Sequence, residues 1–184
     1  MVGGVDRAAD AAAPVVVYLV PGSDLPPGRR WSEPRVLEVT IRDGVMGSDV
    51  PIVEPGQPIS FRNDDRLHHE LFSLDGRNAF ELRVAAGPSM DDMPRAESAA
   101  EVVFEAEGPL AVFCKLHPDE RHWMLVSAPR RHRPLAGDSR FEFHDVPPGR
   151  YRLGAISPVE QSQELELHLG ANERVELRLR MRAR

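Results

Sequence analysis

The chain has 184 residues, of which 41% are apolar and 28% charged, and its formal net charge is -6 at pH 7. The charge is spread along the chain without a long run of one sign, which argues against a surface for nucleic acid or membranes. Seventeen prolines and fourteen glycines favour short strands joined by turns over a helical bundle, so the sequence predicts an all-β fold of one or two domains.

The N-terminal residues divide into a tail and a strand. Residues 1–13 are small and polar and show no period, so we predict a flexible tail. The apolar run PVVVYLV that follows is too short, and its lead too acidic, for a signal peptide, and no later run approaches transmembrane length. Because it is rich in β-branched residues and is closed by Pro21 and Gly22, this run is predicted to be a strand.

The middle of the chain reads as a series of short strands. RVLEVTI, DVPIVEPG and QPISFRND each end in turn residues, at the spacing typical of a β-sandwich or barrel. EVVFEAEGPLAVFCKLH predicts a hairpin whose second strand places Leu110, Val112 and Cys114 on one inward face. HWMLVS resumes as a strand, so residues 115–121 are predicted to be a tight loop between two strands.

The character of the chain changes near Ala128, where APRRHRPLAGDSR forms a basic, proline-containing connection. The strands predicted beyond it are RFEFHDV, YRLGAI, QELELHLG and RVELRLRM, and the last two alternate apolar and polar residues as strands with one buried face do. About 55 residues of this kind make a thin core, so we expect this part to borrow the strand PVVVYLV.

Two segments carry metal-binding chemistry, NDDRLHHELFS and CKLHPDERHWM. Cys114 is the single cysteine and His117 follows it by three residues, and a Cys with two His around a weak axial group is the blue-copper arrangement. His68 and His69 point to opposite faces if they lie in a strand, so at most one is a ligand. Each residue also has an ordinary interpretation: Cys114 as a small buried apolar residue, His122 as a packing residue and Met124 as core.

Taken in order, these pieces resemble the cupredoxins, small copper proteins of which plastocyanin is the familiar member. More narrowly, they look like the plastocyanin-like methylamine utilization proteins, whose pattern is Asn-x-Asp, His-Asn-Val-Phe-Ser, Cys-x-Ile-His with a Met three residues on, and VPPG-x-Y-x-L. The resemblance covers roughly Val15 to Met181, and the positions in register are Asn63, Asp65, His69, Phe72, Ser73, Cys114, His117, Pro118 and residues 146–153.

The resemblance implies that copper is bound by His69, Cys114 and His117, with His68 left unassigned. Two positions depart from the pattern: Glu70 stands where the family has an Asn that braces the ligand loop, and Glu120 stands where it has its axial Met. A carboxylate is hard and anionic, so an axial Glu120 should lower the reduction potential and shift the colour away from blue. His122, Met124 and water stay open as alternatives in that order, and Glu120 with His122 together would also suit zinc.

A second resemblance concerns GDSRFEFHDVPPGRYRLGAI, which is similar to a hairpin in the β-sandwich found as the regulatory domain of carboxypeptidases. It implies that residues 14–22 and 129–184 form one small β-sandwich, into which a Greek-key cupredoxin sandwich of residues 30–127 is inserted. Terminal strands joining the copper domain instead remain an alternative.

The function expected from these features is a copper-binding one-electron carrier and not an enzyme, since no Ser/His/Asp order, phosphate loop or metalloprotease helix is present. Alternatives are a non-redox copper or zinc binder, a degenerate metal-free interaction module, and a small oxidase or reductase with an open copper position. The resemblance implies a redox partner protein and a periplasmic or extracellular location.

Overall fold

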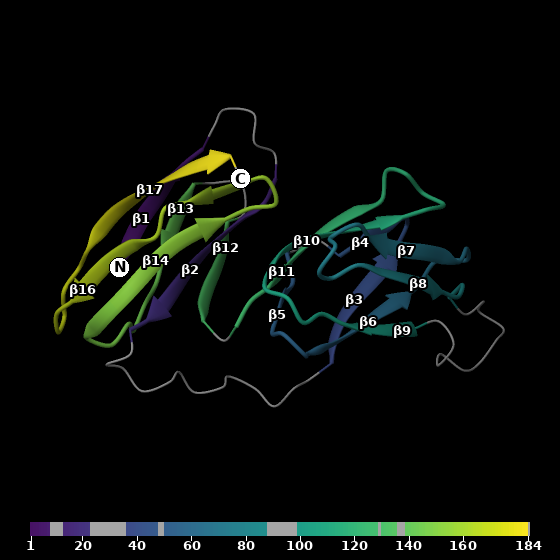
Figure 1. The fold of residues 1–184 in the computed structure, drawn as a ribbon, viewed down its shortest axis with the longest axis horizontal. Helices are drawn as coiled ribbons and strands as arrows, with labels where there is room; N and C mark the ends of the chain where they lie inside the picture. Colours follow the sequence, from purple (N-terminus) through teal and green to yellow (C-terminus); the bar gives the residue numbers. More distant parts are fainter. Residues whose placement is uncertain are drawn as a thin grey trace. The chain divides into compact units, whose positions relative to one another are not determined.

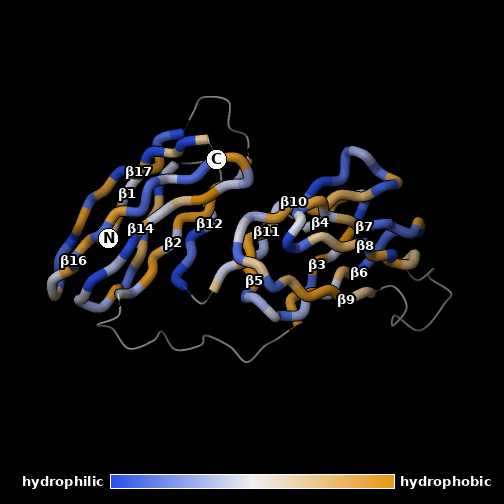
Figure 2. Tube along the Cα trace, in the orientation of Figure 1, coloured by the Kyte–Doolittle hydropathy of each residue, from blue (hydrophilic) through white to orange (hydrophobic). Residues whose placement is uncertain are grey.

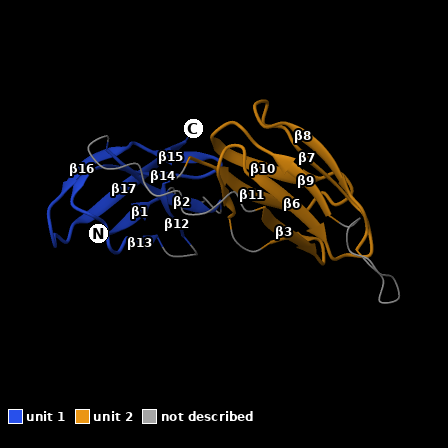
Figure 3. Ribbon diagram, turned by 90° about the horizontal axis from the view of Figure 1, so that it is seen from below, with its two compact units in different colours: residues 1–31, 129–184 blue, residues 32–128 orange. Residues whose placement is uncertain are grey.

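The computed structural model describes residues 1–7, 13–22, 36–47, 50–87, 99–128, 130–135 and 139–183. The regular structure in these ranges consists of strands alone, which confirms the all-β prediction (Figure 1). None of the described ranges contains a helix that is long and apolar enough to pass through a lipid bilayer. The chain divides into two compact units: unit 1 combines residues 1–31 with 129–184, and unit 2 comprises residues 32–128 (Figure 3).

Unit 2 contains two sheets in its described residues. The five-stranded sheet runs in the order β5 (Ile52–Val53), β11 (Arg121–Val126), β10 (Gly108–Cys114), β7 (His69–Ser73) and β8 (Phe80–Val84). The four-stranded sheet runs in the order β4 (Val45–Met46), β3 (Leu37–Arg42), β6 (Pro58–Asn63) and β9 (Ala99–Val103). Pairing is mainly antiparallel, whereas β3 with β6 and β5 with β11 pair in parallel.

The core of unit 2 is built from the inward residues of both sheets. Ile41, Ile59 and Phe61 come from the four-stranded sheet, and they share one buried cluster with Leu71 and Val112 of the five-stranded sheet. All five are fully buried, and burying a side chain of this size contributes roughly 1.5–3 kcal/mol. Unit 2 is therefore a sandwich with a core of its own.

Strand β10 carries the predicted alternation. Leu110, Val112 and Cys114 are buried while Ala111 and Phe113 between them are partly exposed, which confirms the predicted inward face. β10 pairs antiparallel with β11, so the segment between Cys114 and Arg121 is the predicted short loop at one end of the sheet.

Unit 1 contains one continuous sheet in its described residues. Its order is β12 (Arg131–Leu135), β2 (Val15–Pro21), β14 (Gly149–Ile156), β15 (Glu160–Ser162), β17 (Glu176–Ala183), β1 (Val2–Asp6) and β13 (Arg140–Glu142). An eighth strand, β16 (Leu165–Leu169), pairs with β14 outside this path.

Strand β2 lies next to the end of the sheet order of unit 1, between β12 and β14. It is coloured mainly as hydrophobic in Figure 2, and Val15, Val17 and Leu19 are buried in a core shared with Leu153 of β14 and Leu179 of β17. β2 thus pairs with strands that follow it by more than a hundred residues. The assignment of the two units to a carboxypeptidase regulatory-like and a cupredoxin-like domain stays a prediction.

The prediction of a flexible tail over residues 1–13 is wrong for its first part. Val2–Asp6 form β1, which pairs in parallel with β17 and antiparallel with β13. Small residues suit this place because a Cβ on Gly3 would collide with the ring of Phe141, which packs over the strand. Residues 8–12 of the predicted tail lie outside the described residues.

Candidate metal centre

His69 begins β7 and enters the interior of unit 2. His69, Leu71 and Ser73 are buried in alternation with the partly exposed Glu70 and Phe72, and the side chain of His69 is 1% exposed. The neighbouring His68 points the other way, with its Nε2 3.8 Å from the carboxylate of Glu70. Of this pair only His69 is buried, and the statement that at most one of the two is a ligand stays a prediction.

The end of β10 and the loop that follows it carry three further side chains of the candidate site, those of Cys114, His117 and Glu120. Cys114, the last residue of β10, is 4% exposed. The N–H of Lys115 donates to the carbonyl of Glu70 at 2.8 Å, which ties the start of the loop to β7, and the N–H of Glu120 donates to the carbonyl of His117 at 2.9 Å. This turn brings the side chain of Glu120 back toward His117.

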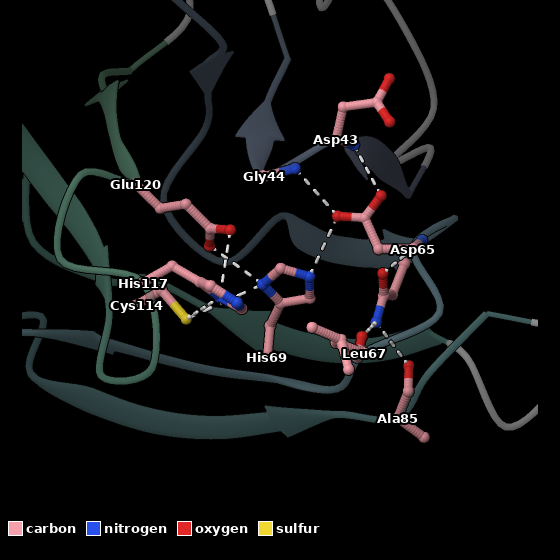
Figure 4. Close-up of polar contacts among 10 residues, drawn as sticks. Asp43, Gly44, Asp65, Leu67, His69, Ala85, Cys114, His117 and Glu120 are labelled. Atoms are coloured by element: carbon pink, nitrogen blue, oxygen red, sulfur yellow. Dashed lines mark hydrogen bonds and ion pairs between the residues drawn. The ribbon is translucent and has the colours of Figure 1, made fainter.

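Four donor atoms converge where this loop meets the start of β7 (Figure 4). The Sγ of Cys114 lies 3.5 Å from His117 Nδ1 and 3.8 Å from His69 Nδ1. The Glu120 carboxylate lies 2.9 Å from His69 Nδ1 and 3.2 Å from His117 Nδ1. All four ligand atoms are within 4.8 Å of one another, so one ion could contact them all. His69, Cys114, His117 and Glu120 are the four residues singled out in the sequence.

The Glu120 side chain is a nearly buried acid with few partners. It is 3% exposed, and the polar partners of its carboxylate among the described residues are His69 Nδ1 and His117 Nδ1. Its Oε1 is buried without a hydrogen bond, since the 3.2 Å approach to His117 Nδ1 lacks hydrogen-bond geometry. Burying a carboxylate without a compensating cation or donor is costly. A bound cation would supply what this oxygen lacks.

The turn between β3 and β4, which belong to the four-stranded sheet, lies next to Glu120. Gly44 has a φ of 71°, and a Cβ there would lie 3.1 Å from Glu120 Oε1. A side chain at this position would therefore be strained and would press on the Glu120 carboxylate. Glycine leaves room for Glu120 to stay among the donors.

Asp65 lies on the opposite side of the His69 ring from the other three donors (Figure 4). Its Oδ2 is 3.2 Å from His69 Nε2, and its carboxylate also accepts the N–H groups of Asp43 and Gly44. Burial opposes ionisation of Asp65, but these two N–H groups and His69 outweigh it and hold the pKa of Asp65 below its ordinary value. The sequence did not predict this contact of Asp65 with His69.

The two side chains that the sequence offered as alternatives for the fourth donor, His122 and Met124, both lie on β11. His122 is buried on β11, where burial lowers its pKa to about 4, and its Nε2 has no hydrogen-bond partner among the described residues. Met124 belongs to the apolar core of unit 2. Among the histidine, cysteine and acidic side chains of the described residues, Glu120 belongs to the converging group and His122 does not.

The donor types decide which ions the group can hold. A thiol and two imidazoles suit copper and zinc, and a carboxylate adds a hard, anionic oxygen that favours the divalent ions. The cluster therefore fits Cu(II) or Zn(II) by its chemistry.

No protein-family model and no curated protein matches the chain. Solved structures of amicyanin are similar to part of it. A mutant amicyanin in the oxidized state is 18% identical, over 50% of this chain and 82% of the amicyanin chain, with a TM-score of 0.41. Amicyanin from Paracoccus versutus is 18% identical over 59% of this chain and 91% of its own, with a TM-score of 0.41. A further mutant in its Cu(I) form is 16% identical over 64% and 95% of the two chains, again with a TM-score of 0.41.

Proposed function

We propose that unit 2 is a cupredoxin-like domain that binds copper and carries single electrons. The observation that carries the proposal is the convergence of one donor atom each from His69, Cys114, His117 and Glu120 within 4.8 Å of one another, with all but His117 buried. The ordered motifs that resemble the cupredoxins run through the same residues. A copper ion held there would supply one-electron redox chemistry.

Each donor would have a distinct role. Cys114, as a thiolate, would be the dominant ligand, and His69 and His117 would complete a three-donor set. Glu120 would take the fourth position in place of the family's methionine. Two anionic donors favour Cu(II) over Cu(I), so we expect a lower reduction potential than a thioether would give.

His117 is the ligand through which we expect electrons to pass. Its side chain is 32% exposed, whereas the side chains of His69 and Glu120 are 1% and 3% exposed. An electron carrier requires a redox partner protein, and the proposal includes one that docks near His117. By its resemblance to an exported family, we also propose a periplasmic or extracellular location.

The proposal is tested by adding Cu(II) to the purified protein and recording the visible spectrum. An intense thiolate-to-copper band is expected in the wild-type protein and should vanish in Cys114→Ser, because the band requires the sulfur ligand. Electrochemistry on the copper-loaded protein should then give a reversible one-electron couple. A wild-type protein without the band, or with a band that survives Cys114→Ser, would overturn the proposal.

Zinc binding without redox function is the second candidate, and Glu120 is the observation that favours it. Two histidines, one cysteine and one carboxylate are all common zinc ligands, and four protein donors make a closed site of the structural kind. Competition between Cu(II) and Zn(II) for the protein distinguishes the candidates. Stoichiometric zinc uptake together with a colourless protein in excess copper would select the zinc binder.

A further inference from the structure

Both ring nitrogens of His69 face a functional group. Nδ1 points toward Cys114 and Glu120, and Nε2 lies 3.2 Å from Asp65 Oδ2. The imidazole is 1% exposed, so water does not compete strongly for either nitrogen. The hydrogen bond that Asp65 accepts from Nε2 therefore determines whether Nδ1, on the other side of the ring, carries a proton or a lone pair.

Asp65 is held firmly by four backbone and side-chain contacts. Its Oδ1 accepts the Asp43 N–H at 2.6 Å and its Oδ2 accepts the Gly44 N–H at 3.0 Å. Its own N–H donates to Asn63 Oδ1 at 2.8 Å, and its carbonyl accepts the Gly87 N–H at 2.6 Å. Asn63 is itself fully buried. The carboxylate thus has a fixed position beside His69.

An ionised carboxylate only accepts hydrogen bonds, so the contact with Asp65 requires a proton on His69 Nε2. A neutral imidazole carries one proton, and placing it on Nε2 leaves the lone pair of Nδ1 free. The 2.9 Å contact of Nδ1 with Glu120 Oε2 then brings two acceptors together, and a cation between them would satisfy both. Nδ1 is the nitrogen that faces the other three donors. A carboxylate partner also makes the imidazole a stronger donor to a metal.

We propose that Asp65 is a positioning residue that holds His69 with its proton on Nε2, so that Nδ1 is presented to the metal. The inference rests on the proposed metal site and adds a residue to it. Gly44, in the turn between β3 and β4, donates its N–H to Asp65 and also lies next to Glu120. This one turn therefore influences two candidate ligands, His69 through Asp65 and Glu120 directly.

The first test compares metal affinity in two alanine variants. Asp65→Ala removes the acceptor beside His69, and Asp64→Ala is a matched control because Asp64 pairs with Arg42 and Arg62 instead. Affinities for Cu(II) and Zn(II) are measured by competition with a chelator. We expect Asp65→Ala to bind about 10–100 times more weakly, and Asp64→Ala to bind as the wild type does.

Asp65→Asn separates positioning from folding. An amide keeps one acceptor oxygen that can still face His69 Nε2, so it should recover part of the lost affinity. Thermal unfolding of the metal-free variants shows whether the fold is retained. Equal affinities for Asp65→Ala and Asp64→Ala would overturn the inference.

The second test needs no metal. Long-range proton–nitrogen NMR correlations on metal-free wild-type protein should show His69 Nε2 protonated, with a slowly exchanging proton that Asp65→Ala loses. An unprotonated Nε2 would overturn the positioning role even if metal binds. If the wild-type protein bound no metal while this proton was present, the proposed function would fail and the contact between Asp65 and His69 would stand.

Discussion

Glu120 is the residue that sets this site apart from the pattern it resembles. Its carboxylate is almost fully buried and contacts two imidazoles, where a thioether would be neutral and soft. In a site shielded from water, an extra negative charge interacts strongly with any bound ion. The charge at this position should therefore govern which oxidation state the site prefers.

Replacing Glu120 by Met should raise the reduction potential of the copper-loaded protein and move its absorption toward that of a blue site. The physical reason is that a neutral thioether stabilises Cu(I) relative to Cu(II) compared with a carboxylate. Visible spectroscopy and voltammetry measure the two effects.

Met124→Leu is the matched control for this substitution. Met124 is 1% exposed and belongs to the core cluster, and Met-to-Leu conserves volume. We expect neither the band nor the potential to change. A response to Met124→Leu together with none to Glu120→Met would mean that Met124, and not Glu120, completes the site.

The four residues that converge could be named from the sequence, whereas the residues that support them could not. The order and spacing of His69, Cys114 and His117 resemble a known motif, and Glu120 stands at the position where that motif has its fourth ligand. Asp65 reads as an ordinary turn residue, because its contacts with Asp43, Gly44 and His69 depend on how two loops meet in the fold. Contacts of that kind leave no periodic signal in the sequence.

At the scale of the strands, the register between β2 and β14 places Tyr18 opposite Gly154. The Tyr18 ring lies where a Cβ of residue 154 would be, and its hydroxyl donates to Glu164 Oε1 at 3.1 Å. Burial, together with the charge and hydrogen bond of Glu164, raises the pKa of Tyr18 to about 12. Glycine at 154 is thus required by the aromatic ring that crosses it.

Gly154→Ala should displace the Tyr18 ring and separate its hydroxyl from Glu164. The pKa of Tyr18 should then fall from about 12 toward its ordinary value of about 10. Ultraviolet absorbance against pH measures this, and subtracting the same titration of Tyr18→Phe isolates Tyr18 from Tyr151.

Gly4→Ala in β1 is the control, since among the described residues a Cβ there has the Ser139 carbonyl oxygen, at 3.6 Å, as its single close neighbour. This substitution should leave the Tyr18 titration unchanged. If the Tyr18 step also stayed near 12 in Gly154→Ala, the ring would not depend on the glycine.

The strands differ in how well the sequence predicted them. β17 alternates apolar and polar residues because one of its faces is buried, and this period of two is visible in the sequence. In β10 the residues from Leu110 to Cys114 are all apolar, and only their burial alternates. β1 has the sequence VGGVD, and its glycines offer no side chains to form a pattern. It is a strand because β13 and β17 bond its backbone from both sides, which only the tertiary structure determines.

At the scale of the whole molecule, the described residues form two hydrophobic cores, one in each unit. The four donor residues all belong to unit 2. A ligand stabilises the part of a protein whose folded form binds it, by about 2.7 kcal/mol at a hundredfold excess over Kd. Binding of metal should therefore stabilise unit 2 against unfolding and leave the stability of unit 1 unchanged.

Hydrogen exchange followed by mass spectrometry tests this division peptide by peptide. Adding Zn(II) should slow amide exchange in unit 2, around β7, β10 and β11, without slowing it in unit 1. Leu153→Ala, which empties space in the core of unit 1, should cost about 2–5 kcal/mol and speed exchange in that unit. Equal effects of either change on both units would show that they unfold as one.

The pairing of β2 with β12 shows where unit 2 is inserted into the sequence of unit 1. The two strands are antiparallel neighbours, with Leu19 opposite Arg131, so they have the geometry of a hairpin whose connecting loop is the whole of unit 2. Loop tips are the positions at which proteins best tolerate inserted domains. A short turn joining β2 directly to β12 would give an uninterrupted unit 1, and the segment removed would contain all four residues of the candidate metal centre.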